Sequence, residues 1–111
     1  MKRISIQSFA VAIAIGMVLV LPSAAGAQNP SETLYKTKCA ACHGPDGSGS
    51  AVGKKLGAHD FHSAEVQAES DAALTAIIAQ GKNKMPAYEK TLKADEITAL
   101  VAYIRSFAPG K

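Results

Sequence analysis

The segment at residues 1–27 limits how much of this chain is left to fold. Lys2 and Arg3 give it a positive start, residues 9–21 (FAVAIAIGMVLVL) carry no charge, and residues 25–27 (AGA) offer a small-residue exit. These are the three parts of a secretory signal peptide. Because the apolar run is shorter than the ~20 residues of a membrane span, we expect cleavage after Ala27; an uncleaved membrane anchor is the alternative.

Cleavage leaves one small periplasmic domain at residues 28–111, with no segment embedded in the membrane. A chain of 84 residues buries a thin core and often relies on a disulfide, a metal or a cofactor. It has no Trp, three Tyr and two Phe, so something other than aromatic side chains is expected to fill its centre. Without Lys2 and Arg3 it carries ten basic and nine acidic residues, and no basic stripe with interleaved aromatics, which argues against nucleic-acid binding.

Apolar residues at helical spacing predict an all-α fold of three main helices and long loops. The first helix is capped by Ser31 and stops near Gly44; the second is capped by Ser70 and ends at Gly81; the last occupies the stretch before Pro109. Residues 44–57 and 82–90 are expected to be loops, and residues 64–68 a short helix.

Residues 39–43, Cys39-Ala40-Ala41-Cys42-His43, form C-x-x-C-H, the attachment motif of c-type haem. Two thiols three residues apart can reach both vinyl groups along one side of a porphyrin, and the next residue places an imidazole over the iron. The motif therefore predicts Cys39 and Cys42 as covalent thioether links and His43 as an axial ligand. One covalent haem would also supply the missing core.

Other interpretations of the two cysteines have less support. A thioredoxin-type disulfide needs a βαβ frame, and no strand pattern is present. Two cysteines and scattered histidines make a poor zinc site. Chance occurrence is disfavoured by the absence of any other cysteine in a small exported chain.

The second axial ligand is expected to be Met85. His59, His62 and Met85 are the sulfur or imidazole candidates that remain outside the motif. Pro86 biases Met85 towards an extended backbone, and the polar setting of Lys82, Asn83 and Lys84 does not suit a core filler. A His/Met pair is a common haem arrangement, so His59 and His62 are expected on the surface.

At this point the chain resembles class I c-type cytochromes of the small bacterial kind. The resemblance is carried by LYKTKCAACHGPDGSG, GKNKMPAY and ITALVAYIRSF, in that order. It implies that the first and last helices cross, with Leu34 and Tyr35 against Leu100, Tyr103 and Ile104. Two departures stand out: Gly53 is followed by Lys54 rather than by a proline whose carbonyl would accept from the proximal histidine, and Lys93 stands where Ser or Thr often caps the last helix.

A monomeric one-electron carrier is the expected function. If His43 and Met85 fill both axial positions, iron has no open position for oxygen or peroxide, and the sequence shows no other catalytic set. The rivals are an enzyme, either a small haem peroxidase or the cytochrome subunit of a dehydrogenase, and a haem-based gas sensor. Rapid carbon monoxide binding would favour the rivals.

The charged residues predict where a redox partner docks. Residues 60–71 hold four acidic residues and no basic one, whereas residues 82–93 hold four lysines and one acid. Lysines beside the proposed methionine ligand, Lys82 and Lys84, would steer an acidic partner to the haem. The alternative is that they are simply the solvated face of a loop.

The first testable prediction concerns haem attachment. Replacing Cys39 or Cys42 with Ser should lower the yield of covalently bound haem, and replacing both should abolish it, because each thiol forms one thioether. Acid–acetone extraction measures this: the haem of the wild-type protein should stay with the protein, and haem that moves into the solvent would contradict covalent attachment.

Overall fold

The computed structural model describes residues 13–19 and 29–110, and residues 29–110 form six helices without a β-strand. They are α1 (Pro30–Lys38), α2 (Ala40–His43), α3 (Ala51–Lys55), α4 (Ala64–Ala68), α5 (Asp71–Gln80) and α6 (Ala94–Arg105). The all-α expectation is confirmed. No helix in these residues has the length and apolar character needed to cross a bilayer. Most of the predicted signal peptide lies outside the described residues.

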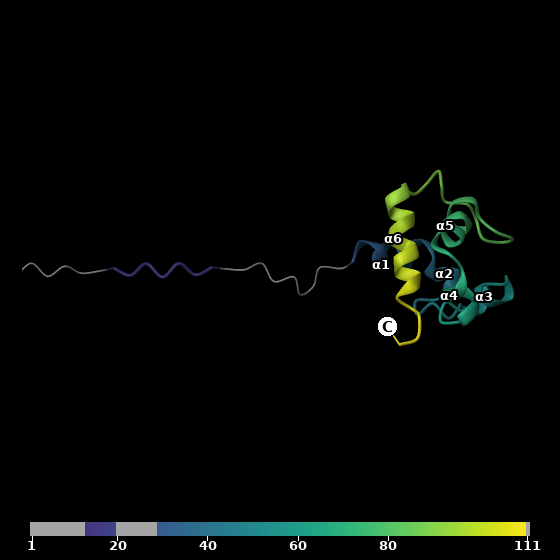
Figure 1. The fold of residues 1–111 in the computed structure, drawn as a ribbon, viewed down its shortest axis with the longest axis horizontal. Coiled ribbons are helices and arrows are strands. Elements are labelled where there is room, and N and C mark those ends of the chain that lie inside the picture. Colours follow the sequence, from purple (N-terminus) through teal and green to yellow (C-terminus); the bar gives the residue numbers. More distant parts are fainter. Residues whose placement is uncertain (1–12, 20–28, 111) are drawn as a thin grey trace, which may run out of the picture.

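Helix α6 packs against α1 and α5 and holds the fold together (Figure 1). The apolar face of α6 buries Ile97, Leu100, Val101 and Ile104. Tyr35 of α1 is fully buried, and its ring centroid lies 4.9 Å from that of Tyr103 on α6. The predicted contact between the first and last helices is therefore present.

Two helix boundaries differ from the prediction. The first helix is divided: Cys39, with φ −116° and ψ −35°, separates α1 from α2. It also starts earlier, because the Asn29 side chain, not that of Ser31, caps α1 by accepting from the Ser31 N–H, and Pro30 occupies the first turn. The predicted cap Ser70 is confirmed on α5, where its hydroxyl accepts from Ala73 N at 3.0 Å.

The region 44–57, expected to be a loop throughout, contains the short helix α3. Ser50 caps it by accepting from the Gly53 N–H at 2.9 Å, a signal that the many glycines of this region concealed. Gly53 lies so close to α2 that a Cβ atom there would be 1.7 Å from the carbonyl oxygen of Cys42. Only glycine therefore allows α3 to pack on the helix that carries Cys42 and His43.

Substituting Gly53→Ala should destabilise the holoprotein at or above the upper end of the ~1–3 kcal/mol typical of overpacking, because the clash is with backbone that cannot rotate away. Denaturant unfolding measures the loss. Val52→Ala is the matched control: Val52 is 61% exposed on the same helix, and its change should stay within about 0.5 kcal/mol. Equal losses from the two variants would contradict the role given to Gly53.

Candidate haem-binding site

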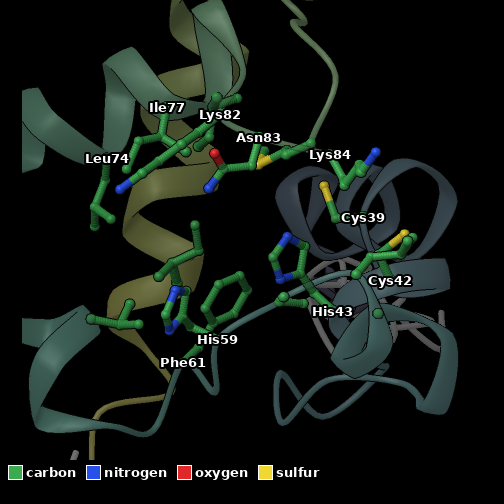
Figure 2. Close-up of a pocket in the computed structure, with 18 of the residues that line it drawn as sticks. Cys39, Cys42, His43, His59, Phe61, Leu74, Ile77, Lys82, Asn83 and Lys84 are labelled. Carbon is green, nitrogen blue, oxygen red and sulfur yellow. The ribbon is translucent and has the colours of Figure 1, made fainter.

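The five-residue motif folds so that its three chemical side chains reach one pocket. Cys39 ends α1 by donating its N–H to Tyr35 O at 2.8 Å, and the N–H groups of Cys42 and His43 both donate to Cys39 O, at 3.2 and 2.9 Å. This single turn places Cys39, Cys42 and His43 in the lining of the same pocket. Figure 2 shows them on one side of it, with Leu74 and Ile77 on the other.

The two cysteines are not joined in a disulfide, and Cys39 is buried enough to change the acidity of its thiol. Desolvation raises the pKa of the Cys39 thiol to about 11, which keeps it protonated near neutral pH. The alternative of a zinc site at the two cysteines finds no further ligands. Across residues 13–19 and 29–110, no cluster of three or more His, Cys, Asp or Glu side chains could hold a metal ion.

His43 is half-buried, and its Nδ1 atom is buried without a protein partner. Its Nδ1 is the one buried side-chain nitrogen or oxygen in the described residues that makes no hydrogen bond. Desolvation, with a smaller effect from the charge of His59, lowers the pKa of His43 and keeps the imidazole neutral. Its ring stacks on Phe61, with centroids 4.5 Å apart and planes at 23°. A neutral imidazole held at the wall of an apolar pocket suits metal ligation.

Met85 reaches the same pocket from a tight turn that follows α5. Lys82 and Met85 exchange two backbone hydrogen bonds, of 3.2 and 2.9 Å. Asn83 between them has φ 53°, a left-handed conformation that Asn tolerates. Gly81, at φ 77°, is also required, because a Cβ atom there would lie 2.6 Å from Met85 O. The loop prediction for this segment is confirmed, and Met85 lines the pocket.

The two other ligand candidates differ in position. The side chain of His62 is 43% exposed; its Nδ1 lies 2.7 Å from Asp60 Oδ1, and it does not line the pocket. The side chain of His59 is 63% exposed but does line the pocket, with Nδ1 3.9 Å from Glu65 Oε1. Both are on the surface, as expected, and His59 is the alternative to Met85 that lies within the pocket lining.

The rest of the pocket wall comes from residues that the sequence did not assign to the haem site. Its apolar side chains are Phe61, Val66, Leu74, Ile77, Ile78 and Ile104. Several of these also belong to the buried core, so pocket and core are continuous. Charged side chains from both predicted segments reach the lining: Glu65 and Glu69 from one, Lys82 and Lys84 from the other.

Comparisons with known proteins agree with this geometry. The family described as cytochrome C oxidase, cbb3-type, subunit III matches residues 26–104. Cytochrome c6 of Rippkaea orientalis (strain PCC 8801 / RF-1) is 34% identical over 109 residues, covering 94% of this chain and 92% of that protein. The cbb3-type cytochrome c oxidase subunit CcoP of Azospirillum brasilense is 36% identical over 90 residues, which cover 78% of this chain but 30% of that subunit.

Solved structures show the same fold. The KustC0563 c-type cytochrome gives a TM-score of 0.67 at 36% identity, covering 70% of this chain and 96% of that chain. The c-type cytochrome NirC gives 0.57 at 22% identity, which supports the fold alone. The two thiols, the neutral, half-buried imidazole and the apolar walls all fit haem. The chain thus belongs to the cytochrome c family, as a small monohaem class I c-type cytochrome: an electron-transfer protein with covalently bound haem c.

Proposed function

We propose that this chain is an exported carrier of single electrons, with haem attached through Cys39 and Cys42 and iron bound axially by His43 and Met85. The proposal rests mainly on one observation: both thiols, the His43 imidazole and the Met85 thioether line the same largely apolar pocket. Segments 42 residues apart, around His43 and Met85, meet there.

Haem c, when bound, supplies an iron that gains and loses one electron. His43 and Met85 would together hold the iron, which would leave no open position for oxygen or peroxide. The thioether of Met85 raises the reduction potential relative to a second histidine. The apolar side chains of Phe61, Leu74 and Ile78 would shield part of the haem from water. Such shielding would favour the less charged, reduced state, because burial disfavours charge.

Export to the periplasm is part of the proposal. Its support is the pattern of residues 1–27, a positive start and a short apolar run. N-terminal sequencing of the exported protein should begin at Gln28, and a chain that still begins at Met1 would point to a membrane anchor instead.

Replacing Met85 with Ala should leave haem covalently attached but change its chemistry. Loss of the thioether should remove the sulfur-to-iron absorption band, lower the reduction potential and permit rapid carbon monoxide binding, all measured by redox titration with optical spectra. The wild-type protein should be six-coordinate, low-spin and resistant to carbon monoxide.

His59→Ala is the matched control, since His59 lines the same pocket. This variant should keep the wild-type spectrum. A spectrum that changed for His59→Ala and not for Met85→Ala would transfer the ligand role to His59, and rapid carbon monoxide binding by the wild type would favour a peroxidase or sensor.

Docking of an acidic redox partner beside the pocket is the second part of the proposal. Lys82 and Lys84 line the pocket, while Lys90, in the same basic segment, does not. Figure 2 shows the Lys82 side chain extending towards Leu74 and the Lys84 side chain lying near Cys39, with Asn83 between them. Positive charge placed there would orient a partner with the haem towards it even though the net charge is small.

The docking proposal predicts how salt and charge reversal change the electron-transfer rate. With an acidic partner protein, the wild-type rate should fall as ionic strength rises, because salt screens exposed charges beyond ~10 Å at 0.1 M. Lys82→Glu and Lys84→Glu should flatten or reverse this dependence in stopped-flow measurements, while Lys90→Glu should have a smaller effect. A flat wild-type response, or equal effects at all three positions, would contradict docking at this edge.

A further inference from the structure

Arg105, the last residue of α6, binds the segment that follows α4. Its Nη1 donates to Gln67 O at 3.0 Å, its Nη2 donates to Glu69 O, and its Nε donates to Asp71 Oδ1 at 3.0 Å. The guanidinium thus satisfies carbonyl groups at the C-terminal end of α4, which would otherwise lack partners. Although Asp71 is mostly exposed, the Arg105 side chain is only 22% exposed. The contact fixes α4 against α6.

Gln67 extends this link towards the pocket without entering it. Its Nε2 donates both hydrogens, to Phe61 O at 2.7 Å and to Ile104 O at 3.0 Å. The backbone N–H of Phe61 in turn donates to Gly47 O at 2.9 Å. Both backbone hydrogen-bonding groups of Phe61 are therefore held, one by Gln67 and the other by the loop after His43.

Phe61 is the neighbour on which the His43 ring rests. The two rings are nearly parallel, and Phe61 is 8% exposed. A ligating histidine is usually oriented by an acceptor for its other ring nitrogen, yet no group in the described part of the chain accepts a hydrogen bond from His43 Nδ1. Packing on Phe61 is then the contact available to set the plane of the imidazole.

We propose that Gln67, held by Arg105, is a positioning residue that sets the orientation of the His43 imidazole through Phe61. The inference rests on the proposed ligation of iron by His43. Arg105, at the end of α6, would then influence the reduction potential of the haem indirectly. The orientation of the ligand ring and the access of water to it both affect that potential.

The test uses Gln67→Met in the purified holoprotein, a change that keeps length and removes both donors. Its ferric electron paramagnetic resonance g-values should shift, and its reduction potential should fall as water gains access to the ligand. Ser70→Ala is the matched control: it removes a helix cap next to the network and costs ~1 kcal/mol. That variant should lower the unfolding midpoint and leave both readouts at wild-type values.

A second substitution tests the route through Phe61. In a Phe61→Leu background, Gln67→Met should shift the potential less than it does in the wild type, because the two residues act in series. Should Gln67→Met fail to accumulate as holoprotein, Arg105→Lys, which keeps the charge and loses the fork of donors, should give the same shifts. Wild-type g-values and potential in the substituted protein, equal shifts from Ser70→Ala, or undiminished shifts in the Phe61→Leu background would overturn the inference. If the unsubstituted protein itself shows no low-spin iron, the proposed ligation by His43 and Met85 is wrong. That result is distinct from a failure of the inference about Gln67.

Discussion

The fold depends on the burial of one tyrosine. Tyr35 is fully buried, and its hydroxyl donates to Gly44 O at 2.6 Å, immediately after the candidate ligand His43. Burial raises the pKa of Tyr35 far above its usual value, so the hydroxyl stays a donor at any physiological pH. Its ring also contacts Tyr103 and Phe107 near the end of α6. The crossing of α1 and α6 and the position of the haem-attachment turn are therefore set by the same side chain, and an unsatisfied partner there would cost ~1–3 kcal/mol.

The core is arranged around the pocket rather than beside it. Phe61, Val66, Leu74, Ile78 and Ile104 belong both to the buried apolar cluster and to the pocket lining. A chain this short has little other apolar mass to bury, so the haem that the family carries completes the core and its loss would expose one side of these residues to water. Stability and cofactor binding are consequently coupled in this protein.

Local patterns predicted the parts of the fold that local chemistry determines. The 3.6-residue spacing of apolar side chains located α5 and α6. The attachment motif and Met85, the one methionine after residue 27, identified side chains that do line one pocket. What the sequence missed depends on contacts between distant segments. Helix α3 packs closely on α2 through Gly53, and the stacking of Phe61 on His43 joins residues whose own neighbours give no hint of it. No proline follows Gly53, and no other described residue accepts a hydrogen bond from His43 Nδ1.

The two candidate axial ligands are held by separate sets of backbone hydrogen bonds, and a side chain joins the two sets. The N–H groups of Tyr88 and Glu89 donate to Ile78 O and Ala79 O of α5, and these bonds hold the loop that carries Met85 in place. The Tyr88 hydroxyl then donates to Lys38 O at 3.1 Å, one residue before Cys39. This hydrogen bond thus directly connects the loop that carries Met85 with the helix end next to the C-x-x-C-H motif. On the proposed ligation, both ligands are positioned before the electron arrives, so little of the chain has to move when the iron changes charge. A carrier built this way needs no catalytic residues, and on the proposed docking its rate depends on how a partner approaches the pocket.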